Sequence, residues 1–289
     1  MEFGDKTLNY DISVIRSVFH LTDFSEASSN AFAHARAIAR FRHARLTIFH
    51  AASGGLRGRS ASQFPEVLRT LQRWGLLAAD SSRRDVFARL SIQVKKVDIK
   101  RHNPVSAAEK YLQSHPTDLI VVATEGREGL PLWMRPSVGE RLARRSETQT
   151  LFVPEGVRGF ISLENGSTSL KRILVPVSHS PDPRPAVVYA NRLIRGLAGK
   201  EIVLLHVGEG NKMPSFVPPS GQACPMSNVH RRGDVVEQIL EVARELPADL
   251  IITSTKGRQG FLEAIQGGTT KRVLRQSPCP LIAVPAPTA

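Results

Sequence analysis

The chain contains two copies of one sequence pattern. Residues 118–129 read DLIVVATEGREG, and residues 249–260 read DLIITSTKGRQG. Two more pairs of blocks match in the same order, namely 46–51 with 202–207 and 149–154 with 280–285. Three matched blocks in the same order make a chance similarity very unlikely, and their spacing is far longer than that of a solenoid repeat. We therefore predict that each copy is a whole domain and that the chain is a fused pair.

The first copy has an insertion that the second lacks. His50 and His206 are 156 residues apart but Asp118 and Asp249 only 131, so the first copy has 25 more residues between these blocks. Its extra stretch, 64–92, has apolar residues at helical spacing, whereas residues 208–228 of the second copy contain four prolines. We expect a helix in the first copy and a loop in the second. Amide hydrogen exchange should then be faster in residues 208–227 than in residues 64–90.

Strands and helices alternate in each copy. Strands such as Leu119–Ala123 are apolar at every position, which is typical of parallel strands covered by helices on both faces. The expected fold is α/β, with two doubly wound, mainly parallel five-stranded, Rossmann-like domains. Expected elements of the first copy are 14–21, 26–41, 46–51, 94–99, 104–114, 119–124, 137–145 and 150–153. Those of the second copy are 173–177, 184–197, 202–207, 227–230, 234–246, 250–254, 269–276 and 281–284.

Domain boundaries follow from the repeat. We place the first domain at residues 11–155, a glycine-containing linker at 156–169 and the second domain at 170–289. The last strand of each copy is short and apolar and lies at the edge of its sheet, and unpaired apolar edges favour pairing. We therefore predict that these two strands pair about a pseudo-twofold axis. A homodimer of the whole chain is also possible.

Composition excludes several classes of protein. No apolar run is long enough to cross a bilayer, the start lacks the layout of a signal peptide, and two cysteines form neither a disulfide framework nor a metal motif, so we expect a cytoplasmic protein. Basic residues outnumber acidic ones by 23 to 16 in residues 1–155 and by 16 to 10 in residues 156–289. This diffuse charge favours anions, but aromatic residues do not alternate with basic ones, so nucleic-acid binding is not expected. We find no catalytic constellation of side chains and no metal-ligand cluster.

Three motifs resemble those of one family. They are Thr22-Asp23-Phe24-Ser25 after the first strand, the strand end Leu204-Leu205-His206-Val207, and the closing run RVLRQSPCP at 272–280. Together they resemble a tandem universal stress protein, and the resemblance extends from Val14 to Pro285. For nucleotide-binding members it implies a phosphate motif, Gly-x2-Gly-x9-Gly-Ser/Thr. It also implies an acidic residue near the nucleoside, after the first strand.

Both copies depart from that motif. The first reads Ala123-x2-Gly126-x9-Pro136-Ser137, and Pro136 has no N–H group to donate to a phosphate. The second keeps two of the three glycines. From the resemblance, the candidate nucleotide-binding residues of the second domain are Ser178, Val207, Ser254, Gly257, Arg258, Gly267, Gly268 and Thr269. Those of the first domain are Asp23, Ala51, Gly126 and Ser137.

The expected function is ligand binding and signalling in a stress response. The resemblance favours a nucleotide, ATP for preference and with Mg²⁺ if bound, mainly in the second domain. A non-nucleotide interaction module and a weak nucleotide hydrolase are the alternatives. Simpler interpretations apply to other polar residues: His50 and His206 pack or form hydrogen bonds, Asp23 or Ser25 caps a helix, Asp118 and Asp249 shape the turns before their strands, and Cys279 is structural.

Overall fold

A computed structural model describes residues 15–52, 67–100, 103–124, 142, 148–209, 213–215, 221, 224–256 and 269–286. The strands are β1 (Ser17–Leu21), β2 (Arg45–Ala52), β3 (Val94–Lys100), β4 (Leu119–Thr124), β5 (Thr150–Pro154), β6 (Arg172–Pro176), β7 (Glu201–Val207), β8 (Met226–Arg231), β9 (Leu250–Lys256) and β10 (Leu281–Ala286). The helices are α1 (Glu26–Arg42), α2 (Val67–Arg73), α3 (Arg83–Leu90), α4 (Pro104–Ser114), α6 (Arg184–Gly196), α7 (Val235–Glu245) and α9 (Thr269–Gln276). Most of these bounds lie within one or two residues of those expected, and β1 begins three residues later.

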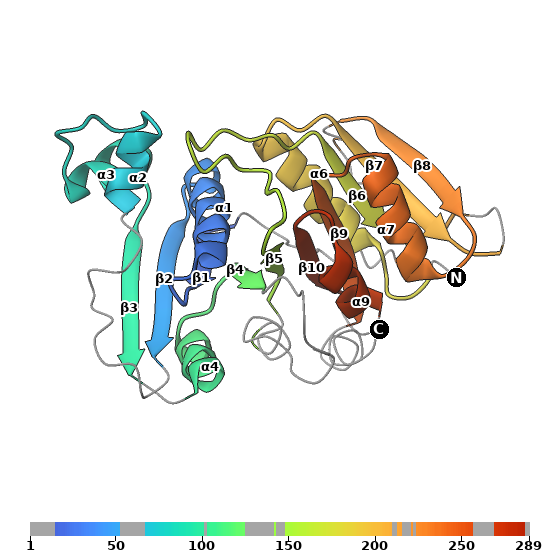
Figure 1. Cartoon of the computed structure of the whole chain (residues 1–289), viewed down its shortest axis with the longest axis horizontal. Helices are drawn as coiled ribbons and strands as arrows, with labels where there is room; N and C mark the ends of the chain where they lie inside the picture. Colours follow the sequence, from blue (N-terminus) through green and yellow to red (C-terminus); the bar gives the residue numbers. More distant parts are fainter. Residues whose placement is uncertain are drawn as a thin grey trace, which may run out of the picture.

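The two copies share one ten-stranded sheet. Its order is β3-β2-β1-β4-β5-β10-β9-β6-β7-β8, so the second half repeats the strand order of the first in reverse. Within each half all neighbouring strands are parallel. At the centre β5 and β10 are antiparallel, with Leu281 opposite Phe152 and Ala283 opposite Thr150. The predicted pairing of the last strands is therefore confirmed (Figure 1).

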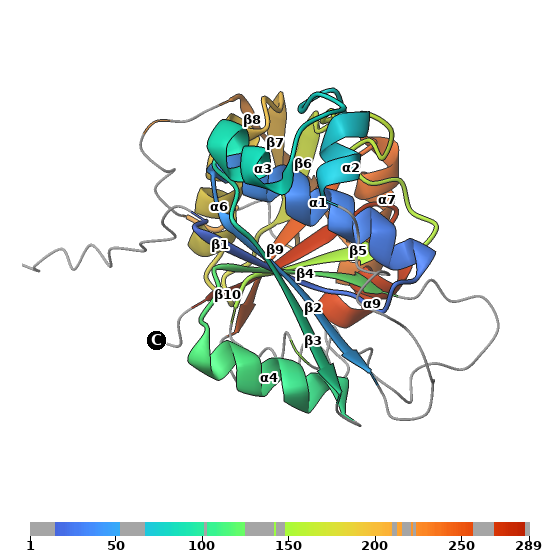
Figure 2. The same cartoon turned by 90° about the vertical axis from the view of Figure 1, so that its left-hand side faces the viewer.

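Helices cover both faces of the sheet, and each face has its own hydrophobic core. One core includes α1, α2, α3 and α6, and the other includes α4, α7 and α9. Figure 2 shows α1 and α4 on opposite sides of the strands between them. Each core contains residues of both copies, so the halves are packed together on both faces. Among the described helices, none is long and apolar enough to cross a bilayer.

The helical insertion of the first copy is two helices, α2 and α3, where one was expected. Leu71 and Trp74 are buried, as their spacing predicted. Trp74 covers a cation: the guanidinium carbon of Arg36 in α1 lies 3.3 Å from its ring centroid, and Arg36 is fully buried. Burial lowers the pKa of Arg36 to about 9. No helix is found in the described part of the corresponding stretch between β7 and β8.

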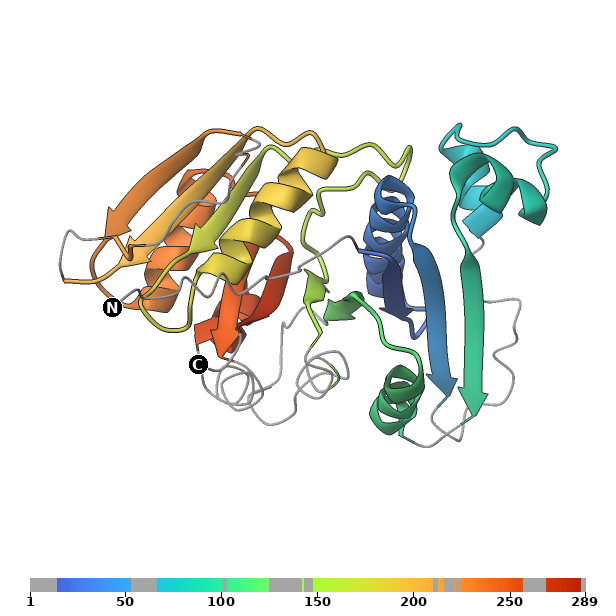
Figure 3. The ribbon, with the colours of Figure 1, turned by 180° about the vertical axis from the view of Figure 1, so that it is seen from behind.

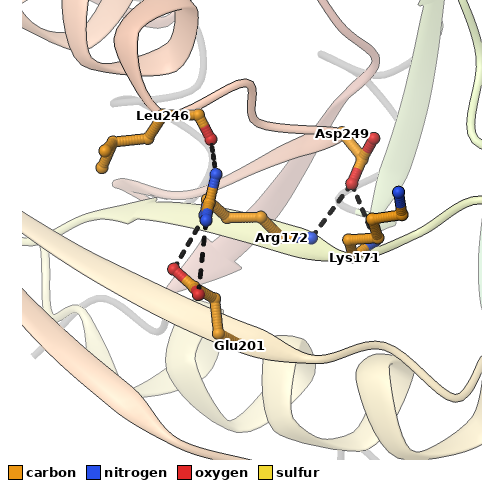
Figure 4. Close-up of polar contacts among 5 residues, drawn as sticks. All are labelled: Lys171, Arg172, Glu201, Leu246 and Asp249. Carbon is orange, nitrogen blue, oxygen red and sulfur yellow. Dashed lines mark hydrogen bonds and ion pairs between the residues drawn. The ribbon is translucent and has the colours of Figure 1, made fainter.

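An aspartate before the fourth strand of each copy holds the start of the first strand. Asp118 Oδ2 accepts hydrogen bonds from the backbone N–H groups of Arg16, at 2.9 Å, and Ser17, at 2.8 Å. Asp249 Oδ2 does the same for Lys171, at 2.7 Å, and Arg172, at 3.0 Å (Figure 4). Each carboxylate thus joins two neighbouring parallel strands at their amino ends, a role wider than shaping a turn.

The segment expected to be a linker packs closely against the first copy. Phe160 is fully buried, and its backbone N–H donates to Nε2 of His34 in α1 at 3.1 Å. Trp74 Nε1 donates to the carbonyl oxygen of Leu163 at 3.1 Å. Gly159 is required here, because a Cβ atom would stand 2.1 Å from Cε1 of His34. Residues 155–169 therefore contribute to the core around α1.

Candidate functional site

The candidate site of each half lies where its parallel strands end and its first helix begins. In open α/β sheets this carboxyl edge is where ligands bind. The structure places Asp23 and Ala51 at this edge in the first half and Ser178, Val207 and Ser254 in the second, with Thr269 at the start of α9. Other candidates lie outside the described residues, namely Gly126, Ser137, Gly257, Arg258, Gly267 and Gly268.

The edge of the first half carries two carboxylates and an aromatic ring. His50 at the end of β2 faces Asp98 of β3 in register, and its Nδ1 lies 2.9 Å from Asp98 Oδ1. The Phe24 ring packs against His50 with centroids 4.2 Å apart, and Phe24 has a φ of +66°, which is uncommon outside glycine. Asp23 is exposed, and its Oδ1 accepts from the backbone N–H of Ser25 at 2.9 Å. Ser25, and not Asp23, caps α1.

The edge of the second half carries histidines at the matching positions. His206 at the end of β7 faces His230 of β8, with ring centroids 5.4 Å apart. His206 Nδ1 lies 3.0 Å from the carbonyl oxygen of Val177, so Nδ1 carries the proton and donates. His179 contributes a third ring, 5.8 Å from that of His206. His50 and His206 both form hydrogen bonds, as expected, but with different partners.

The backbone at Gly208 lies close to the His206 ring at this second edge. A Cβ atom at Gly208 would stand 2.9 Å from Nε2 of His206, so residue 208 packs directly on the imidazole. Nε2 of His230 is buried without a hydrogen-bond partner. The second edge thus has an imidazole ring at the position where the first edge has a carboxylate.

Two candidate serines already have partners. Ser254 is buried in β9, and its Oγ accepts from the backbone N–H of Ala186 in the first turn of α6 at 3.3 Å. Ser178 Oγ donates to the carbonyl oxygen of Ser180 at 2.9 Å. Val207 is partly buried at the end of β7, and Thr269 is exposed. Ser254, which replaces the first glycine of the phosphate motif, thus fixes the start of α6.

Two arginines near the second edge are paired with acidic residues. Arg231 at the end of β8 pairs with Glu245 at 2.7 Å. Arg272 of α9 pairs at 3.3 Å with Asp234, the residue that caps α7. A hydrogen bond from the backbone N–H of Glu237 is the largest of the effects that lower the pKa of Asp234. Asp234 therefore stays ionised, and α7 and α9 are linked beside the site.

The described residues give no support to metal or thiol chemistry, and Cys279 lies just before β10, at the opposite edge of the sheet. The described residues contain no group of three or more His, Cys, Asp or Glu side chains arranged to hold a metal ion. Cys279 is buried, and this burial raises the pKa of its thiol to about 12. A protonated, buried thiol is a poor nucleophile, in agreement with a structural role.

Sequence reasoning missed the difference between Asp98 and His230. The signal was present: Val97-Asp98 aligns with Val229-His230 once each third strand is set in register with its second strand. The packing of Phe24 on His50 could not be found from the sequence, because it depends on a left-handed backbone at a non-glycine residue.

Comparisons with known proteins agree with the fold. The model of the universal stress protein family matches residues 16–154 and 225–285. Universal stress protein Sll1654 of Synechocystis sp. is 27% identical over 140 residues, covering 42% of this chain and 88% of that protein. The crystal structure of a universal stress protein from Archaeoglobus fulgidus aligns with a TM-score of 0.59 at 15% identity, covering 93% of this chain and 96% of the other. Protein PA1789 of Pseudomonas aeruginosa, described as functionally unknown, aligns with a TM-score of 0.61 at 13% identity, covering 95% and 94%. The chain belongs to the universal stress protein family.

Proposed function

We propose that this universal stress protein binds a nucleotide, ATP for preference and with Mg²⁺ when bound, mainly in its second half, and that binding serves signalling in the cytoplasm. The resemblance of the second phosphate motif to that of nucleotide-binding members supports a nucleotide.

The proposal that the nucleotide binds mainly in the second half rests on a difference in charge between the carboxyl edges of the two halves. Asp23 and Asp98 lie at the first edge, and Ser178 and His230 take the matching places at the second. Two unit charges 4 Å apart interact by about 1 kcal/mol in water and about 4 kcal/mol near a protein surface. Repulsion of that size weakens phosphate binding by one to three orders of magnitude. Phe24 also covers His50 in the first half.

Calorimetry with ATP tests the proposal through a matched pair of variants. His230→Asp gives the second half the carboxylate of the first, and we expect at least tenfold weaker binding. Asp98→Asn removes that carboxylate from the first half and should leave the affinity of the second unchanged. Gly267→Val should abolish binding, because it crowds the phosphates, whereas Ser137→Ala should have little effect.

Four results would contradict the proposal. One is a pair of sites with equal affinity for ATP. Another is binding that Ser137→Ala abolishes and Gly267→Val leaves unchanged. Either result would show that the proposal assigns the ligand to the wrong half. Absence of ATP binding, with no nucleotide found by mass spectrometry of freshly purified and denatured protein, would favour the interaction module. Release of phosphate that depends on His206 would favour a weak hydrolase.

A further inference from the structure

A hollow lies between the two halves, away from the strand ends described above. Residues in the second halves of α1 and α6 line it, together with Ile15 just before β1. The two helices are seen in Figures 1 and 3. Because α1 and α6 start at the carboxyl edge of the sheet and run back, this hollow lies at the amino ends of the first strands. Together with its open mouth, and counting the space that is open to solvent, it encloses about 430 Å³.

The walls of the hollow are mainly apolar. Each copy contributes to them, with Ile38 and Phe41 from α1 and Leu193 and Leu197 from the second copy. Such a surface takes up the hydrocarbon part of a ligand, at roughly 25 cal/mol per Å² of apolar area removed from water. The hollow exists only because the two copies share one sheet, so neither copy contains it alone.

The polar side chains that line the hollow can all donate hydrogen bonds. Arg42 and Arg192 line it, as does Tyr189, which is 3% exposed. The Tyr189 hydroxyl and Nε of Arg42 are buried and have no hydrogen-bond partner in the structure. Burial of a donor without an acceptor is unfavourable, and native structures rarely leave one without a reason. An acceptor from a bound molecule would satisfy both groups.

The side chains around the hollow favour a negatively charged molecule. None of the described residues that line the hollow is acidic. The carboxylate of Asp118 has an electrostatic effect on Tyr189, but it already accepts hydrogen bonds from the backbone N–H groups of Arg16 and Ser17. Burial raises the pKa of Tyr189, so its hydroxyl keeps its proton and can donate.

We propose that the hollow binds a small monocarboxylic acid with an apolar body, whose carboxylate accepts hydrogen bonds from Tyr189 and Arg42 while its hydrocarbon part packs between α1 and α6. This site is separate from the proposed nucleotide site. A molecule bound there would contact both halves and would stabilise their packing around the central strands.

Calorimetry with octanoate on the full chain tests the proposal, with octan-1-ol and octylamine as probes of equal length. We expect octanoate to bind at least tenfold more tightly than either. Gly196→Leu should abolish binding, because residue 196 lines the hollow and its Cβ would stand 3.9 Å from Nη1 of Arg42. Gly196→Ala adds only that Cβ and is the matched control, which should keep most of the affinity.

The donors are tested separately, with variants that keep the shape of the site. Tyr189→Phe and Arg42→Gln should each weaken octanoate binding about tenfold, whereas Arg195→Gln, on the same helix but outside the lining, should not. In NMR spectra, octanoate should shift the Nε–Hε resonance of Arg42, and octan-1-ol should not. These readouts remain informative if Gly196→Leu fails to fold.

Several outcomes would overturn the proposal. They are absence of octanoate binding below its micelle concentration, equal affinity for octan-1-ol, and binding that Gly196→Leu leaves unchanged.

Discussion

Acid should destabilise this protein through His34, a residue of α1 that is buried against the segment 155–169. Its Nε2 accepts from the backbone N–H of Phe160 at 3.1 Å, and its Nδ1 lies 2.8 Å from the carbonyl oxygen of Asn30. The ring is therefore neutral, with its proton on Nδ1. Desolvation by burial lowers the pKa of His34 from 6.5 to about 4.

The sign and size of the effect follow from proton linkage. Between pH 6.5 and 4 the unfolded chain binds a proton that the folded chain does not, so stability is complete above pH 6.5 and is lost as the pH falls towards 4. Between pH 7 and pH 5 the two pKa values give a loss of about 2 kcal/mol of unfolding free energy from His34 alone. His20 is also fully buried, and desolvation lowers its pKa to about 4, so a second loss of similar size is expected.

Urea unfolding at pH 7 and pH 5 measures this loss directly. In His34→Gln the amide oxygen can still accept from Phe160, but nothing titrates, so the loss between pH 7 and pH 5 should shrink by about 2 kcal/mol relative to wild type. His115→Gln, which removes an exposed imidazole, is the control variant. If His34→Gln lost as much stability as wild type between the two pH values, or if the His34 ring titrated near pH 6.5 in NMR spectra, the reasoning would be wrong.

Four further effects are expected. Tyr189→Phe should raise the unfolding free energy in urea by about 1 kcal/mol, since it removes a buried hydroxyl without a partner; a loss of stability would show that the hydroxyl is bonded. Asp249→Ala should lower it by about 2 kcal/mol, because two backbone donors lose their acceptor, and Asp249→Asn should lower it by less. Gly159→Ala should be strongly destabilising by thermal unfolding, since His34 would have to move. Hydrogen exchange should be faster in residues 208–227 than in α2 and α3, and equal protection would contradict the expected loop.

Most of the fold could be predicted because most strands have a recognisable local sequence pattern. Residues 119–123 are apolar at every position and lie in β4, an interior strand of the sheet, and the repeat assigned the same role to β9. The pairing of β5 with β10 about a pseudo-twofold axis was predicted from two short apolar strands at sheet edges, and the structure shows that it is antiparallel. Such features depend on the hydrophobic pattern, which is visible directly in the sequence.

What could not be predicted depends on contacts between distant segments. Glycines in residues 156–169 indicated a linker, yet Phe160 is buried against His34, 126 residues away. Trp74 is buried as expected, but its ring also lies over the guanidinium of Arg36, which was not expected. Local propensity cannot reveal either contact, because the partner is chosen by the packing of helices and not by sequence spacing.

Comparison of the two halves separates residues that serve the fold from residues that select a ligand. The aspartate that joins the starts of neighbouring strands occurs in both copies, as Asp118 and as Asp249, with the same backbone acceptor role. At the opposite edge the copies differ, and His50 faces an aspartate where His206 faces a histidine. Both halves still need the same sheet, so the amino ends of their strands have remained alike. This difference at the carboxyl edge supports the proposal that the two halves bind ATP with unequal affinity. Exchanging Asp98 and His230 between the halves should therefore narrow the difference between their affinities.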